Sequence, residues 1–108
     1  MNMNQFTQKT VAALERAQSL AIEYQHMNVE QEHLMLALTE NGDELIPQLL
    51  AKCGVSVPAL VAGLKDNLDR IPRVSGSGRE PGKVYIANDV EQALLEAEKA
   101  AEIGRAHV

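Results

Sequence analysis

Apolar residues recur along the first part of the chain at steps of three and four, the period of an amphipathic helix. Residues 8–24 carry two neighbouring apolar stripes of this kind. The two stripes consist of Val11, Leu14 and Ala21, and of Ala13, Ala17, Leu20 and Tyr24. Because together they form a wide apolar face, we predict a helix that packs against neighbours on more than one side.

Three shorter helices are predicted to follow. The run LeuMetLeuAlaLeu at residues 34–38 is apolar on all sides, so its helix should be deeply buried. A third helix runs up to Gly54, a natural stop residue, with Cys53 on its apolar side and therefore expected to be buried. A fourth begins at Ser56, whose hydroxyl can cap it, and ends before Pro72.

Residues 72–83 interrupt this helical pattern. They contain two prolines, three glycines and two serines without any helical or strand period, which is typical of a linker. A short extended piece at residues 83–86 is expected next, and a fifth helix from Asn88 onward. The expected buried stripe of that helix is Val90, Ala93 or Leu94, Ala97 and Ala101.

The fifth helix repeats the first. A shift of about 80 positions pairs Phe6 with Ile86, and the Ala13-Leu14 dipeptide with Ala93-Leu94. Repeat units stack because one unit alone cannot bury its apolar face. We therefore predict one all-α domain over residues 1–108, an orthogonal bundle of about five helices with pseudo-twofold symmetry. Its first repeat spans about 5–71, its linker 72–83, and the start of a truncated second repeat 84–108.

Charge and composition narrow the classes of partner. The formal net charge of −5 disfavours nucleic acid, which is bound largely through Lys and Arg. No apolar run is long enough to span a bilayer and no signal peptide is evident, so we expect no membrane partner and a cytoplasmic location. A single cysteine, Cys53, allows no intramolecular disulfide.

No residue pattern indicates catalysis. GlySerGly at 76–78 lacks the strand and lysine of a phosphate-binding loop. Glu32-His33 lacks the second histidine of a zinc motif, so His33 is expected to form hydrogen bonds in the core at a helix start. We expect no catalytic residue, no metal and no cofactor. Leu95 lies off the apolar stripe of its helix; it is either an isolated exposed leucine or part of a groove between repeats.

Several short motifs together resemble a known family. They are Phe6-Thr7 at the first helix, the Ala-Leu-x-x-Ala rhythm at 13–17, His26-x-x-Val29, Glu32-His33-Leu34 followed by Leu36-Ala37-Leu38, and Gly54-Val55. This set resembles the N-terminal domain of the Clp ATPases, the double Clp repeat. The segment from Leu68 to Pro72 with the ValSerGlySerGly after it is similar to the branch of ClpB-type disaggregating chaperones.

The resemblance implies a function. Such domains are helical, sit above a homohexameric ring of ATPase modules, and do not hydrolyse ATP themselves; ATP belongs to those modules. They engage exposed apolar segments of misfolded or aggregated proteins, or adaptor proteins, and pass them to the ring. Thr7 matches a position tied to substrate engagement, and Glu32 matches a ligand-contact position in the ClpC branch. The expected substrate-binding residues are Phe6, Thr7, Val11, Glu32, Leu95 and Ala100.

Two alternatives remain open from the sequence. The first is an adaptor-docking domain of a ClpC- or ClpA-type regulator of proteolysis, in which the charge of Glu32 would matter more than Leu95. The second is a self-associating helical domain whose second-repeat face forms dimers.

Overall fold

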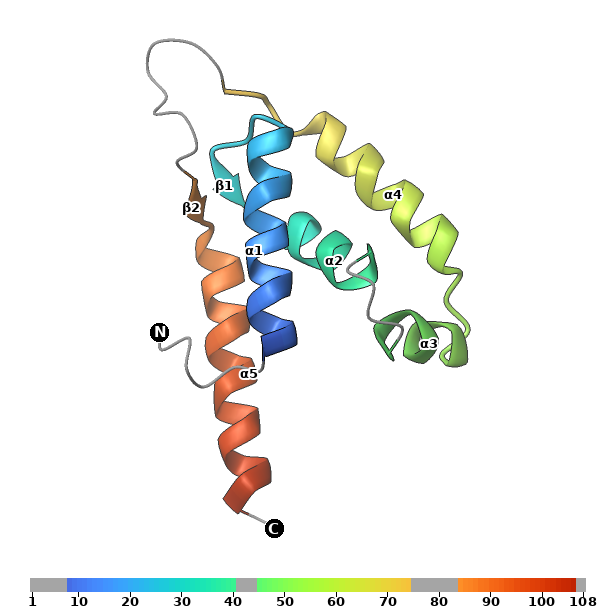
Figure 1. The fold of residues 1–108 in the computed structure, drawn as a ribbon, viewed down its shortest axis with the longest axis vertical. Helices are drawn as coiled ribbons and strands as arrows, with labels where there is room; N and C mark the ends of the chain where they lie inside the picture. The colour runs from blue at the N-terminus through green and yellow to red at the C-terminus, as the bar shows by residue number, and fades with distance from the viewer. Residues whose placement is uncertain (1–7, 41–44, 75–83, 107–108) are drawn as a thin grey trace.

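The computed structural model describes residues 8–40, 45–74 and 84–106, apart from the side chains of Lys9, Glu98 and residues 101–106. Five helices and one pair of very short strands make up this part of the chain (Figure 1). In chain order the elements are α1 (Gln8–Glu23), β1 (Asn28–Val29), α2 (Gln31–Glu40), α3 (Leu45–Lys52), α4 (Val57–Arg70), β2 (Tyr85–Ile86) and α5 (Asn88–Ala106). The predicted all-α class is confirmed. The linker at residues 75–83 lies outside the described residues, so the repeat boundaries stay a prediction.

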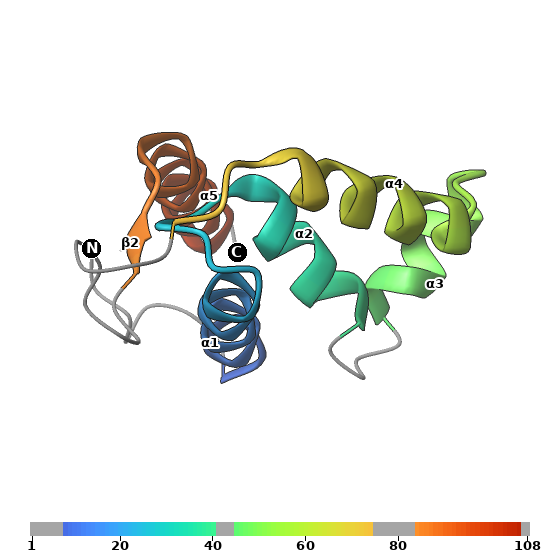
Figure 2. The same ribbon diagram turned by 90° about the horizontal axis from the view of Figure 1, so that it is seen from above.

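The main core lies where α1 and α4 pack on α2. Figure 2 shows α2 between these two helices, with α5 on the side of α1 away from α3. The core cluster consists of Ala17, Leu20, Ala21, Val29, Leu36, Ala37, Leu64 and Leu68. The small side chains on α1 let its backbone approach α2 closely, while leucines fill the remaining space. The prediction of a helix buried on all sides was wrong for α2, because Met35 faces outward with 39% of its surface exposed.

Two helices end in the same hydrogen-bonded turn with different residues. After α1, the His26 N–H donates to the Ala21 carbonyl at 2.8 Å, and Gln25 adopts a left-handed φ of 59°. After α3, the Val55 N–H donates to the carbonyl five residues earlier, and Gly54 takes the left-handed position with φ 84°. Both are Schellman-type turns, in which glycine is the unstrained choice. The turn after α1 directs the His26 side chain inward, where it is 1% exposed.

The predicted start of α4 is confirmed, and the predicted burial of Cys53 was wrong. The Ser56 hydroxyl accepts a hydrogen bond from the Ala59 N–H at 3.4 Å, with Pro58 in the first turn. Cys53 is exposed, and the α3 helix before it contributes no fully buried residue to the core. The helical period predicts this thiol on an apolar face of its helix, but no neighbouring element buries that face.

A two-stranded parallel pairing joins the two repeats. The Tyr85 N–H donates to the Met27 carbonyl at 3.0 Å, and the Ala87 N–H donates to the Val29 carbonyl at 3.1 Å. These bonds position the start of α5 next to the junction between α1 and α2. From there α5 runs antiparallel to α1 and projects past its first turn (Figure 1).

The predicted shift of 80 positions aligns α5 with α1, and the two helices are buried differently. The predicted buried stripe of α5 was partly right: Val90 and Leu94 are buried, Ala97 is exposed, as is Ala93, and the side chain of Ala101 lies outside the described part. The α1 equivalents of Ala93 and Ala97, which are Ala13 and Ala17, are buried at 1% and 0%, since α1 has α2 packed on that face.

Among the described helices, none by itself is long and apolar enough to cross a bilayer; α3 and α4 meet such a criterion only jointly, as a pair bent by 109°.

Candidate functional site

The second apolar cluster of the domain lies between α1 and α5. Leu14 of α1 and Val90 and Leu94 of α5 are buried together there, with Leu34 and Ala87 packed partly against them. We call these five residues the α1–α5 seam. Leu14 and Leu94 are repeat equivalents, so the seam is an approximately self-complementary contact of the kind that a twofold relation generates.

Two predicted substrate-binding residues flank this seam. Val11 lies one turn before Leu14 on α1, and Leu95 directly follows Leu94 on α5; both are half-buried. Because the two helices are antiparallel, both residues lie on the side of the seam toward the start of α1. Leu95 is half-buried and so is not an isolated exposed leucine, and its part in a groove between repeats stays a prediction.

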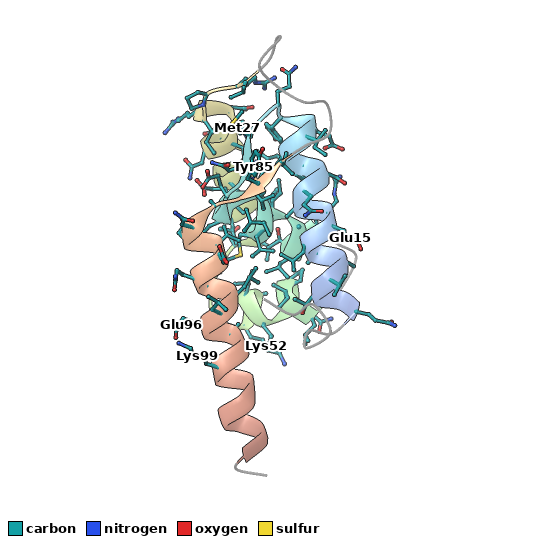
Figure 3. The ribbon with its side chains drawn as sticks, turned by 90° about the vertical axis from the view of Figure 1, so that its left-hand side faces the viewer. Glu15, Met27, Lys52, Tyr85, Glu96 and Lys99 are labelled. Atoms are coloured by element: carbon teal, nitrogen blue, oxygen red, sulfur yellow. The ribbon has the colours of Figure 1, made fainter. Side chains whose placement is uncertain are left out.

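The exposed surface continues along α5. Ala100 is exposed and follows Lys99, which Figure 3 shows on the part of α5 that projects past the first described turn of α1. The Lys99 ammonium pairs with the Glu96 carboxylate at 3.9 Å on the surface of the helix. Phe6 and Thr7 lie outside the described residues, so their part in substrate binding stays a prediction.

Glu32 lies apart from the other predicted substrate-binding residues that the structure describes. It lies in the first turn of α2, near Glu30 and near Asp89 at the start of α5, and we call these three the acidic corner. The Gln31 side-chain amide donates to the Asp89 carboxylate at 3.1 Å, which ties the two helix starts together. Asp89 and Ala100 are eleven residues apart on one helix, about 16 Å along its axis. The predicted site is therefore split between two ends of α5.

The acidic corner is electrostatically strained. Partial burial raises the pKa of the Glu30 carboxyl above its ordinary value, and the negative charges of Asp89 and Glu32 raise it further. A hydrogen bond from the Asn28 side chain acts in the opposite direction. A cationic group binding here would relieve this repulsion.

A third surface was not predicted as a site. Met27, Tyr85 and Ile86 surround the β1–β2 pair with exposed fractions of 38%, 53% and 37%. Figure 3 shows Met27 and Tyr85 close together on one face. The sequence does predict a short extended piece at residues 83–86. Its strand partner lies 57 residues earlier, and a two-residue strand has too few positions to show a hydrophobic period.

A buried histidine pair lies behind these surfaces. The Nδ1 atom of His26 is 2.8 Å from Nε2 of His33, and the Tyr24 ring stacks on His26 with ring centroids 5.5 Å apart. The Glu30 N–H donates to Nδ1 of His33 at 2.8 Å, which confirms the expectation of a core histidine at a helix start. Burial, and then the neighbouring His26, lower the pKa of His33 to about 4, partly opposed by the Glu30 backbone contact.

Within residues 8–40, 45–74 and 84–106, no three His, Cys, Asp or Glu side chains are grouped so that they could hold a metal ion. What these residues do offer is contact surface. Small aliphatic side chains line α5, and carboxylates occupy its N-terminal end.

Comparison with known proteins identifies a matching family and several similar proteins. Residues 5–107 match the family model described as the Clp repeat (R) N-terminal domain. The chain is similar to the chaperone protein ClpB of Bacillus cereus, with 41% identity over 102 residues, covering 94% of this chain and 12% of that protein. ClpB of Nitratidesulfovibrio vulgaris is 34% identical over 101 residues, with shares of 94% and 12%. ClpB 1 of Thermosynechococcus vestitus is 37% identical over 99 residues, with shares of 92% and 11%. The chain thus spans about an eighth of the length of the relatives it matches.

Proposed function

This chain belongs to the Clp repeat N-terminal domain family, in the form found in ClpB-type chaperones, and we propose that it is a substrate-recognition domain. It engages exposed apolar segments of misfolded or aggregated proteins and passes them to the ATPase ring of a homohexameric parent protein in the cytoplasm. The domain itself performs no catalysis, and ATP is bound by other modules of that parent.

The observation that supports this proposal most directly is the apolar surface along α1 and α5. Val11 and Leu95 are half-buried at the edge of the seam, and Ala100 is exposed beyond them. Shallow aliphatic contacts of this kind favour a wide range of apolar segments, because they make no directional hydrogen bonds. Each methyl-sized contact contributes roughly 1 kcal/mol, so a few of them give weak binding and allow release.

The test is a titration of the 15N-labelled chain with a permanently unfolded, reduced and alkylated protein. We expect amide shift changes on α1 and α5, and a loss of affinity of roughly fivefold in Leu95→Ala, equivalent to about 1 kcal/mol. Leu49→Ala is the matched control, since Leu49 is 48% exposed on α3, away from the seam. Shift changes confined to α3 and α4, or a larger effect of Leu49→Ala, would exclude the proposal.

A second candidate function rests on the acidic corner. The raised pKa of Glu30 marks a site where a cationic group of a folded adaptor would be stabilised by Glu32 and Asp89. In that case Glu32→Lys abolishes partner binding and Leu95→Ala leaves it unchanged. Client capture at the seam gives the opposite order of effects, so the two variants in one binding assay separate the two functions.

A further inference from the structure

The histidine pair closes a ring of hydrogen bonds around β1. His26 immediately follows the turn after α1, and Glu30 immediately follows β1. The Glu30 N–H is bonded to His33, and His33 is bonded to His26, both at 2.8 Å. The two ends of the segment 26–30 are therefore tied to each other through His33, and this segment supplies the carbonyls of Met27 and Val29 that hold β2.

The direction of these bonds is determined by the backbone. An amide N–H can only donate, so Nδ1 of His33 must be an acceptor without a proton. Neutral His33 then carries its proton on Nε2 and donates it to Nδ1 of His26, which must also be bare. His33 occupies the position at which the Glu or Gln of a capping box would accept the same N–H.

Neither His26 nor His33 can bind a second proton without breaking one of these hydrogen bonds. A second proton on His33 would be bound to Nδ1. It would then face the Glu30 N–H, so that two donors would meet and no hydrogen bond could form there. A second proton on His26 would sit on Nδ1 and face the Nε2–H of His33. If His33 instead carried its proton on Nδ1, Nε2 could accept from His26, but Nδ1 could no longer accept from the Glu30 N–H. Either protonation therefore breaks at least one of the two bonds that close the ring.

We propose that the His26–His33 pair is an acid-operated latch: proton uptake by either imidazole opens the ring around β1 and releases β2 and α5 from the α1–α2–α4 core. The release follows because α5 has few other attachments among the described residues. These are the seam and the hydrogen bond from Gln31 to Asp89. The α1–α2–α4 core keeps its own leucine and alanine cluster and does not depend on α5.

The groups around the latch allow this response. In the turn after α1, the Tyr24 ring stacks on His26, and α4 contributes to the core the apolar side chains of Leu60, Val61, Leu64 and Leu68. The Glu30 backbone N–H bonds to His33, and the Glu30 carboxyl lies near the negative charges of Asp89 and Glu32. Burial and the neighbouring His26 both lower the pKa of His33, so its surroundings disfavour an imidazolium while the ring is closed.

The first measurement is the tautomer of each histidine, from nitrogen chemical shifts of the 15N-labelled full chain at pH 7. We expect both His26 and His33 as the Nε2–H tautomer with Nδ1 bare. An Nδ1–H tautomer for either residue, or an ordinary titration of His33 near pH 6.5 in the folded state, would overturn the proposal.

The second measurement is amide hydrogen exchange at Tyr85 and Ala87, whose N–H groups bond to β1. An imidazole with a pKa of about 4 when closed and 6.5 when open makes the opening roughly 25-fold more favourable at pH 5 than at pH 7. We expect the protection factors of these two amides to fall by that amount, at values well below those of the α4 amides. Protection independent of pH, or equal to that of α4 at every pH, would overturn the latch.

Two variants sharpen the result. His33→Asn keeps an acceptor for the Glu30 N–H but cannot titrate, so its loss of protection in acid should be smaller than in the unmodified chain. Glu30→Gln removes the neighbouring carboxyl, whose pKa is raised, and should leave the acid response in place. An unreduced response in His33→Asn, or a response abolished by Glu30→Gln, would assign the effect to the carboxylates. The two measurements on the unmodified chain decide the question even where a variant does not fold.

Discussion

Leu94 and Leu95 offer a matched test of how α5 packs on the domain. They are adjacent leucines in one helix and differ by about 100° in direction around its axis. Leu94 is 6% exposed in the seam with Leu14 and Val90, whereas Leu95 is half-buried at its edge. Alanine at either position removes the same three carbon atoms, so any difference in stability reports the environment.

The expected magnitudes follow from burial. Removing three buried carbons costs about 2.4 kcal/mol by transfer alone, at roughly 0.8 kcal/mol per methylene. A cavity adds to this, but the seam is small and near the surface, so Leu94→Ala should cost about 2–3 kcal/mol. Leu95→Ala leaves no enclosed cavity and removes about half as much buried surface, so its cost should be under about 1 kcal/mol.

The assay is urea unfolding followed by circular dichroism, together with amide exchange at Tyr85 and Ala87. Leu14→Ala and the Leu14/Leu94 double variant complete a thermodynamic cycle, in which a coupling of about 1 kcal/mol would report direct contact. Equal costs for Leu94→Ala and Leu95→Ala, or a larger cost for Leu95→Ala, would refute the orientation of α5 and with it the seam.

Three further predictions concern local features. The lowered pKa of His33 means that the unfolded chain binds a proton that the folded chain does not. Stability should therefore be complete above pH 6.5 and fall by about 3 kcal/mol as the pH drops to about 4; a constant urea midpoint over this range would contradict it. Gln25→Gly should stabilise the folded state by about 0.5–1 kcal/mol, because glycine adopts a φ of 59° without strain. Gly54→Ala should destabilise it by about 1 kcal/mol for the same reason. Thermal melts with the opposite signs would count against both turns. Ser56→Ala should cost about 1 kcal/mol through loss of the α4 cap, whereas an unchanged melting temperature would show that the cap contributes nothing.

The helices themselves were largely predictable, and the errors share one cause. Ser56 and Gly54 mark helix ends through chemistry that acts over three to five residues, and both were identified correctly. Cys53 and Met35 were assigned to buried positions because they lie on apolar stretches. Both are exposed, because burial requires a neighbour and the period of a helix carries no information about where that neighbour lies.

The candidate site was predicted in pieces. Val11 and Leu95 are half-buried and lie next to seam residues along the chain, but Glu32 lies at the other end of α5 from Ala100. The inward turn of His26 was missed, because it depends on a left-handed Gln25, a conformation that glutamine rarely adopts. The strand pairing that positions α5 was also missed, since two-residue strands carry almost no pattern.

By itself the sequence determined the helices and the cap at Ser56, because these are encoded by side chains a few positions apart, and it predicts an 80-residue repeat by direct comparison of two segments. Only the tertiary structure decided which faces are buried, that Leu14 meets its own equivalent Leu94, and that His26 and His33 share a hydrogen bond. The physical reason is that burial and hydrogen-bond partners depend on residues brought together from distant parts of the chain. The same alanine rhythm is therefore covered in α1 and exposed in α5.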